Sequence, residues 1–173
     1  LMPGYRLSRA GAAALIAGSV SSWDQLKDYE TKTVYIPENG IDLARFPPVA
    51  REQPNTPLRV AFVGRLVPYK GADMLMIAAE PFIKSGRVIL DIIGDGPERA
   101  ALTALRDSMG LNENVRIDGW VEHTRLKERL RFAHVFGFPS VREFGGAVVL
   151  EAMAMGLVPI VVGYGGPGEL VTE

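Results

Sequence analysis

The sequence predicts an α/β fold built on a doubly wound, Rossmann-like parallel sheet. From about Leu58 to the C-terminus, short runs rich in β-branched residues alternate with segments of helical character. This alternation is typical of β-α-β units joined by right-handed crossovers. Before Leu58 the composition changes to a proline-rich connector over residues 47–57, which is typical of a linker. The chain is therefore expected to divide at residue 58.

The predicted domain alternates buried strands with helices. The strands are expected at 59–64, 88–94, 115–118, 134–139 and 158–162. The helices are expected at 71–84, 98–109, 124–132 and 147–155, with a last one opening near Gly168. Ligands of such sheets bind outside the carboxyl ends of the strands. The residues that follow each strand are therefore the candidates for a functional site.

Composition excludes several classes of protein. With 173 residues, 47% of them hydrophobic, the chain is long enough for one domain core with an appendage. The formal net charge of -1 gives no basic excess for a nucleic acid. Without cysteine, the chain has no disulfide framework, thiol nucleophile or cysteine-ligated zinc. Its two histidines are too few for a histidine cluster. This composition fits a cytoplasmic protein.

The N-terminal part contains an alanine-rich run over residues 10–17, preceded by Arg6 and Arg9. This arrangement loosely mimics a secretory signal, but the run is far shorter than the ~20 apolar residues of a membrane-spanning helix. We interpret it as an interior strand or helix of a truncated domain. Residues 1–57 are thus expected to be the end of that domain plus a linker, and residues 58–173 a domain truncated at its C-terminus.

Two cations stand in the loop after the first predicted strand. Arg65 and Lys70 occur within the segment 64–71, and Lys70 lies where the next helix begins. A cation at a helix N-terminus is unfavourable by a few tenths of a kcal/mol, so its presence there favours a bound anion. A diphosphate could take bidentate hydrogen bonds from Arg65 and a point charge from Lys70. The alternative is that both are solvated surface cations.

The loop after the fourth predicted strand carries Glu143, Gly145 and Gly146 and leads into an apolar helix that contains Glu151. A buried carboxylate is costly unless it is hydrogen-bonded, and the two hydroxyls of a sugar diol could supply the donors. The glycines would let a ligand approach the N–H groups at the helix N-terminus. The alternatives are that Glu151 complements the helix dipole or pairs with a cation, and that the glycines form a simple turn.

Two other chemistries are less well supported. Glu143 and Glu151 could form the acid and nucleophile pair of a glycoside hydrolase, but one lies in a loop and the other in a buried helix. A metal-dependent transferase usually presents an Asp-x-Asp motif, which is absent from the sequence. We therefore expect no metal and no cofactor, with leaving-group charge met by Arg65, Lys70 and helix N-termini.

Taken together, these motifs resemble the retaining group-1 glycosyltransferases of the two-Rossmann-domain (GT-B) fold. That family carries a Glu-x7-Glu signature, which Glu143 and Glu151 match, followed here by the Ala-Met-Ala-Met-Gly of residues 152–156. Further matches occur at residues 158–161, in the Gly-Arg and Lys-Gly of the 64–71 loop, in Gly-Asp-Gly-Pro at 94–97, and, in the linker, at 37–42 with Phe46. One departure is that the family usually has Glu-x-Phe-Gly, whereas Phe144 directly follows Glu143.

The resemblance implies a role for each position. Arg65 and Lys70 would hold the donor diphosphate, and Glu151 the ribose hydroxyls. Glu143 would be the catalytic residue beside the transferred sugar, with the backbone of Gly145 and Gly146 facing sugar and phosphates. Gly96 and the Trp120-Val121 segment would lie near the base.

The resemblance also implies partners and a place for the enzyme. The chain would be the C-terminal, donor-binding half of a cytoplasmic enzyme that uses a nucleotide-sugar donor. The acceptor, a glycan, lipid or small molecule, would bind the N-terminal domain, whose last segment would be about residues 1–20. Peripheral association of the full-length enzyme with the inner face of the membrane stays open. The chain alone is expected to bind nucleotide but to transfer sugar poorly, because the closed cleft cannot form.

Two rival interpretations share the nucleotide-binding fold. A dinucleotide-binding module is suggested by Gly163, Gly165 and Gly168, which follow a strand and open a helix. However, the loop after the first strand has only Gly64 where such a module needs three glycines. The second rival is a nucleotide-sugar epimerase. Of the histidines, His134 is interpreted as structural, and His123 as a residue that could cap the following helix.

Overall fold

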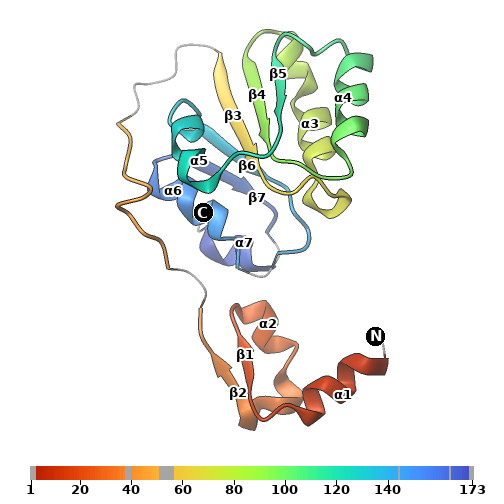
Figure 1. Cartoon of the computed structure of the whole chain (residues 1–173), viewed down its shortest axis with the longest axis vertical. Helices are drawn as coiled ribbons and strands as arrows, with labels where there is room; N and C mark the ends of the chain where they lie inside the picture. The colour runs from red at the N-terminus through yellow and green to blue at the C-terminus, as the bar shows by residue number, and fades with distance from the viewer. Residues whose placement is uncertain (1–2, 38–39, 51–56, 144, 164, 172–173) are drawn as a thin grey trace.

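The computed structural model describes residues 3–37, 40–50, 57–143, 145–163 and 165–171. Its main feature is a five-stranded parallel sheet in the order β5-β4-β3-β6-β7 (Figure 1). The strands are β3 (Leu58–Val63), β4 (Val88–Ile93), β5 (Val115–Asp118), β6 (Val135–Phe138) and β7 (Val158–Val161). The order reverses between β3 and β6, which is the position where doubly wound sheets bind ligands. The predicted fold class is confirmed.

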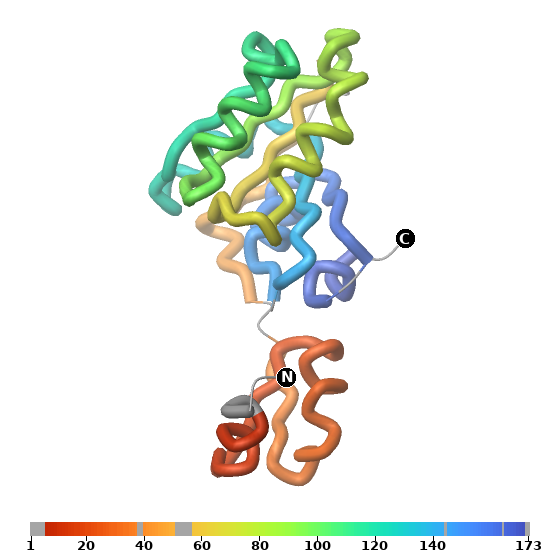
Figure 2. The backbone as a smooth tube through the Cα atoms, turned by 90° about the vertical axis from the view of Figure 1, so that its right-hand side faces the viewer, coloured from red at the N-terminus to blue at the C-terminus, as the bar shows by residue number. Residues whose placement is uncertain are grey.

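Helices cover both faces of this sheet. They are α3 (Ala72–Lys84), α4 (Arg99–Ser108), α5 (His123–Leu130), α6 (Ala147–Ala154) and α7 (Gly165–Leu170). Figures 1 and 2 show α3 and α4 on one face, with α5 and α6 on the other. The last helix begins at Gly165, three residues before the predicted start. Pro167 suits this first turn because the N–H that proline lacks has no helical partner there.

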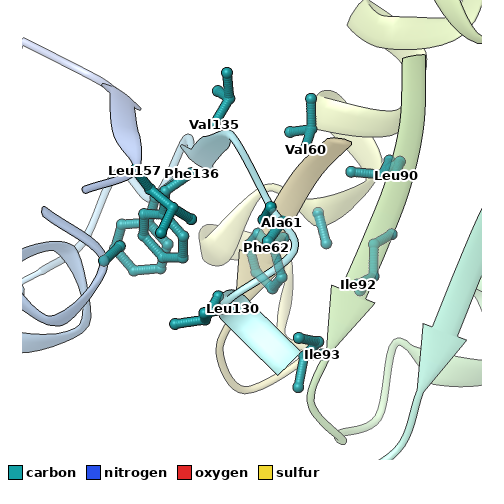
Figure 3. Packing of buried hydrophobic residues seen from close by; sticks show 14 of the residues in the cluster. Val60, Ala61, Phe62, Leu90, Ile92, Ile93, Leu130, Val135, Phe136 and Leu157 are labelled. Atoms are coloured by element: carbon teal, nitrogen blue, oxygen red, sulfur yellow. The ribbon is translucent and has the colours of Figure 1, made fainter. Parts of the chain in front are cut away.

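The core lies between the sheet and its helices. Residues of the central strands, such as Phe62, Leu90, Ile92 and Phe136, have no exposed surface, and Figure 3 shows them within the cluster of buried hydrophobic residues. Parallel strands are covered on both faces, which is why they appear in the sequence as nearly continuous apolar runs. This rigid sheet fixes the positions of the loops at its carboxyl edge.

The segment predicted as a linker packs on the domain in part. Phe46 is only 3% exposed and belongs to the hydrophobic core. A tight turn precedes it, in which Asp42 accepts hydrogen bonds from the N–H groups of Ala44, Arg45 and Phe46 at 2.9, 3.0 and 3.1 Å. Farther along, the N–H of Val49 donates to the carbonyl of Met155 at 3.3 Å. Pro54 and its neighbours at 51–56 lie outside the described residues.

The N-terminal unit comprises α1 (Pro3–Gly11), β1 (Leu15–Ala17), α2 (Val20–Asp24), a 3₁₀ segment (Lys27–Lys32) and β2 (Thr33–Tyr35), with β1 and β2 paired in parallel. The alanine-rich run therefore ends one helix and forms a strand, within the range of the prediction. The carboxylate of Glu169 on α7 accepts hydrogen bonds from the N–H groups of Val20 and Ser21 at 2.8 and 2.9 Å, which joins the unit to the main domain. In the described part of the chain, every helix is too short or too polar to cross a bilayer.

Candidate functional site

Two cavities open at the carboxyl edge of the sheet. The smaller one, of about 520 Å³, lies where β3, β4 and β5 end, and its walls include Gly64, Arg65, Asp95, Val121 and His123. The larger one, of about 770 Å³, is lined on one side by Tyr69, Lys70 and residues 141–143, and on the other by residues of the N-terminal unit. The loop that follows β3 contributes to both cavities.

Backbone packing holds the loops of the smaller cavity close together. Leu66, which has no exposed surface, donates its N–H to the carbonyl of Asp95 at 2.9 Å. A Cβ at Gly96 would lie 2.3 Å from the carbonyl oxygen of Leu66, so only glycine fits there. Gly96 thus keeps the loops after β3 and β4 in contact. This packing role is separate from the position near a base that the resemblance implied.

The smaller cavity combines one cation with an aromatic residue at its edge. Arg65 is exposed and directly follows Gly64 at the end of β3. Val121 is half-buried in the opposite wall, next to Trp120, whose surface is 74% exposed. Both predicted residues, Arg65 and Val121, therefore line the same cavity. A guanidinium beside an apolar wall suits a ligand with an anionic part and a flat apolar part.

Glu151 lies beside this smaller cavity and has a partner within the protein. Its position in the second turn of α6 leaves its side chain 13% exposed, and its Oε1 lies 2.8 Å from Nε2 of His123. Nδ1 of His123 lies 2.8 Å from a guanidinium nitrogen of Arg45. The helix around Glu151 is partly buried, with Val149 and Ala152 inside the core. The pairing with His123 was missed by the sequence analysis.

Lys70 and Glu143 form a second pair, in the larger cavity. Lys70 ends a 3₁₀ turn (Pro68–Lys70) before α3, and its ammonium contacts Oε1 of Glu143 directly. The same carboxylate oxygen accepts a hydrogen bond from the hydroxyl of the buried Ser140 at 3.1 Å. Burial lowers the pKa of Lys70 because the charged form loses hydration. The anion expected beside Lys70 is thus supplied, in the free protein, by Glu143.

Gly145 and Gly146 lead into α6 as expected. Gly146 is the N-cap residue, with φ at +73°, a left-handed conformation that favours glycine. Among the described residues no side chain caps this end, and the N–H of Val149 donates to the carbonyl of Gly146 at 2.8 Å, so the N–H groups before it are the ones that could meet other acceptors. Phe144, where the sequence departs from the family pattern, lies outside the described residues, as does the Glu38-Asn39 part of the 37–42 motif.

The two histidines behave differently from each other. His134 accepts a hydrogen bond from the N–H of Arg59 at 3.0 Å, which confirms its structural interpretation. His123 begins α5 rather than capping it, and the N-cap residue Glu122 makes no side-chain bond to the helix. His123 follows β5, so the rule that ligands bind at the carboxyl ends of strands could have identified it as a site residue.

The predicted site residues therefore fall into two groups. Arg65 and Val121 line the smaller cavity, and Glu151 contacts His123, which also lines it. Lys70 and Glu143 pair in the larger cavity. The two predicted phosphate-binding cations thus line different cavities, at opposite ends of one loop.

Comparison with known proteins identifies the family. The profile of the family described as "Glycosyl transferases group 1" matches residues 48–173. The chain belongs to this family. The 2-deoxystreptamine N-acetyl-D-glucosaminyltransferase of Niallia circulans is 32% identical over 66% of this chain and 30% of its own length. D-inositol 3-phosphate glycosyltransferase 1 of Catenulispora acidiphila is 29% identical over 91% of this chain and 42% of its own. The chain thus spans less than half the length of these glycosyltransferases.

Solved structures confirm the fold. Sucrose-phosphate synthase of Thermosynechococcus elongatus superposes with a TM-score of 0.78 at 27% identity, over 93% of this chain and 44% of that one. HepE of Anabaena, solved in complex with UDP and glucose, superposes with a TM-score of 0.79 at 21% identity, over 98% of this chain and 50% of that one. Such neighbours are GT-B glycosyltransferases, so the fold implied by the resemblance is confirmed.

Proposed function

We propose that this chain is the donor-binding half of a retaining glycosyltransferase that uses a nucleoside-diphosphate sugar. The observation that carries the proposal is the loop after β3, which borders both cavities and brings a cation to each, Arg65 to one and Lys70 to the other. A nucleotide sugar has a matching layout, because its diphosphate joins a nucleoside to a sugar. The complex of HepE with UDP and glucose supports this class of ligand.

In the proposed complex, the nucleoside occupies the smaller cavity and the diphosphate follows the loop from Arg65 to Lys70. The base lies against Val121, and the ribose hydroxyls bond to Glu151. The sugar extends into the larger cavity toward Glu143, with the N–H groups at Gly145 and Gly146 facing its phosphate end. The cavity volumes of about 520 and 770 Å³ are in the range of small-molecule sites.

In this proposal, binding of the donor exchanges the counterion of Lys70. In the free protein each side chain is the counterion of the other. A bound diphosphate would replace Glu143 as the counterion of Lys70, which would leave the Glu143 carboxylate for the hydroxyls of the sugar. Ser140 would keep that carboxylate in place meanwhile, since its hydroxyl bonds Oε1 independently of Lys70.

The transfer step would break the bond from the anomeric carbon to the β-phosphate oxygen and join that carbon to an acceptor oxygen on the same face, while the proton of the acceptor hydroxyl passes to the departing diphosphate. Charge on the departing diphosphate would be stabilised by Arg65, Lys70 and the N-terminus of α6, without a metal ion. The acceptor, a glycan, lipid or small molecule, would approach from the side of the N-terminal unit. We place the enzyme in the cytoplasm, with peripheral association at the inner face of the membrane as an open element of the proposal.

The dinucleotide-binding alternative gains no support from the sheet. Its glycines follow β7, which is an edge strand, whereas the dinucleotide fingerprint belongs to the first strand at the centre of such a sheet. The family match favours sugar transfer over epimerisation.

A thermal-shift panel of UDP, GDP, ADP and their sugars tests the proposal. A nucleotide at 100 times its dissociation constant stabilises the protein that binds it by about 2.7 kcal/mol. We expect the nucleotides of one base to raise the melting temperature clearly. UDP is the first candidate, because HepE was solved with it. A panel in which every nucleotide leaves the melting temperature unchanged would contradict donor binding by this chain.

A further inference from the structure

We propose that Arg45 and His123 are positioning residues for Glu151: Arg45 fixes the tautomer of His123, and His123 in turn holds the carboxylate ready for a ribose. This inference rests on the proposed function, since it concerns the same nucleotide site. Neither residue belongs to the Glu-x7-Glu signature or to the phosphate loop. Arg45 comes instead from the segment that was predicted to be a linker.

The geometry determines which imidazole nitrogen carries the hydrogen. A guanidinium nitrogen of Arg45 lies 2.8 Å from Nδ1 of His123, and Glu151 Oε1 lies 2.8 Å from Nε2. Because a guanidinium can only donate, Nδ1 must accept. The hydrogen of a neutral imidazole then sits on Nε2, where it donates to the carboxylate. The opposite tautomer would set a donor against a donor on one side, and a lone pair against a carboxylate on the other.

The local fold holds Arg45 in place for this role. The turn that begins at Asp42 is closed by hydrogen bonds to the N–H groups of Ala44, Arg45 and Phe46. Phe46 is anchored in the core, and the centroid of its ring lies 5.3 Å from that of the His123 ring. Consecutive residues of one turn therefore contact the same imidazole, one by a hydrogen bond and one by ring packing. The turn and the core anchor thus fix the backbone from which the Arg45 side chain reaches the imidazole.

The consequence for Glu151 is a carboxylate that is oriented before the ligand arrives. An ionised carboxylate has about four lone-pair sites, and the imidazole occupies one of them. The others can accept two ribose hydroxyls. Because the Glu151 side chain is only 13% exposed, its orientation determines whether a hydroxyl can reach it. His123 should therefore affect the discrimination between ribose and deoxyribose more than the affinity for phosphate.

The tautomer can be measured without any ligand. Nitrogen-15 NMR of the imidazole distinguishes a protonated Nε2 from a protonated Nδ1. We expect the Nε2–H form in the unmutated chain, and in Arg45→Leu an altered Nδ1 signal with an increased share of the Nδ1–H form, because only Glu151 then favours Nε2–H. Arg125→Leu is the matched control, because this exposed arginine of α5 contacts Glu128 instead. An Nδ1–H form in the unmutated chain, or an unchanged spectrum in Arg45→Leu, would overturn the proposal.

The second experiment measures binding of UDP and GDP, each beside its 2′-deoxy analogue. The unmutated chain should prefer the ribonucleotide by about tenfold, the cost of one lost hydrogen bond to a charged group. His123→Phe keeps a ring but removes the donor, and should bring the preference close to unity. His123→Gln restores an N–H donor and should recover much of it, while Arg45→Leu should give an intermediate value.

The outcomes separate this inference from the proposed function. A full ribose preference in His123→Phe would overturn the positioning role and leave donor binding intact. Equal binding of ribonucleotide and deoxyribonucleotide by the unmutated chain would overturn the ribose assignment of Glu151, and the positioning role with it. Circular dichroism of each variant excludes unfolding as the cause, since a folded variant that loses only the ribose preference supports the proposal.

Discussion

The two cavities differ in what their walls are made of. The smaller cavity is lined entirely by residues of the β3–β7 domain, from Val63 to Leu126. The larger cavity takes only part of its lining from that domain and the rest from the N-terminal unit, including Arg9, Ile16 and Gln25. In the function proposed above, recognition of the nucleotide would therefore reside in one domain, whereas the space for the reacting sugar would depend on both. The proposal thus predicts that binding and transfer can be separated.

Arg65 and Lys70 also differ in how far the protein encloses them. Arg65 is exposed in the smaller cavity, and its charge is well hydrated. Lys70 is enclosed by Glu143 and by the rings of Tyr69 and Phe138, whose centroids lie 6.0 and 5.2 Å from its ammonium. An enclosed cation has a structural as well as a binding role, because removing it leaves a poorly solvated carboxylate. Substitutions at the two positions should therefore have different consequences.

The largest effect is expected for Lys70→Ala. This variant should lose about 1–3 kcal/mol of affinity for UDP and also about 1–2 kcal/mol of folding stability, because Glu143 is left without its counterion. Calorimetric titration and urea unfolding measure the two losses. The double variant Lys70→Ala with Glu143→Gln is the control, since it should regain stability but not affinity. An unchanged affinity in both variants would remove Lys70 from the phosphate site.

Arg65→Ala should weaken UDP binding by a similar amount, about 1–3 kcal/mol, and leave the melting temperature of the free protein nearly unchanged. The exposed guanidinium keeps most of its hydration in the folded protein, so its removal should change the free energy of unfolding little. Arg87→Ala, at an exposed position directly before β4 and so at the opposite edge of the sheet from both cavities, serves as a comparison for loss of charge alone. Equal losses in the two variants would mean that Arg65 acts only through net charge.

The affinity for UDP should depend on pH through Lys70. Burial lowers the pKa of Lys70 below its ordinary value of 10.5, so the folded protein releases this proton earlier than the unfolded chain does. Between the lowered pKa and 10.5, the unfolded state binds more protons, and stability gains from rising pH. A diphosphate prefers the charged form, so affinity should fall as pH rises through the lowered pKa. Lys70→Met should show a flat profile in that alkaline window.

The smallest effect is expected for metal removal. If Arg65, Lys70 and the α6 N-terminus meet the charge of the diphosphate, EDTA should leave the affinity for UDP unchanged in a calorimetric titration. Titration with added Mg²⁺ is the complementary control. A large loss of affinity with EDTA would show that a cation takes part in holding the phosphates.

The sequence predicted the sheet well because its central strands, β3, β4 and β6, are mostly buried and therefore appear as apolar runs. The observed strands agree with the predicted ones to within about one residue at each end, from β3 to β7. Turns and caps were less predictable, as the early start of α7 at Gly165 shows. The role of Phe46 was also hidden, because a short anchored segment among prolines has the composition of a linker.

The sequence pointed to residues of the candidate site but not to their pairing. Strand ends and the family motif pointed to Arg65, Lys70, Glu143 and Glu151. The contacts between them join positions far apart in the chain: Lys70 meets Glu143 across 73 residues, and His123 meets Glu151 across 28. Such pairs depend on the order of the strands in the sheet, which local sequence patterns do not reveal. The contact of Arg45 with His123, across 78 residues, could not be predicted for the same reason.

The central claim, that the nucleotide binds in the cavity walled by the β3–β7 domain, is tested most directly by an NMR titration of the labelled chain with UDP or the best nucleotide of the panel. The account predicts that the largest amide shifts fall on residues 64–65, 94–95, 120–121 and 123, which line the smaller cavity. Residues 19–26, in the wall that the N-terminal unit gives to the larger cavity, should change little. Shifts confined to residues 19–26 and 141–143 would contradict it.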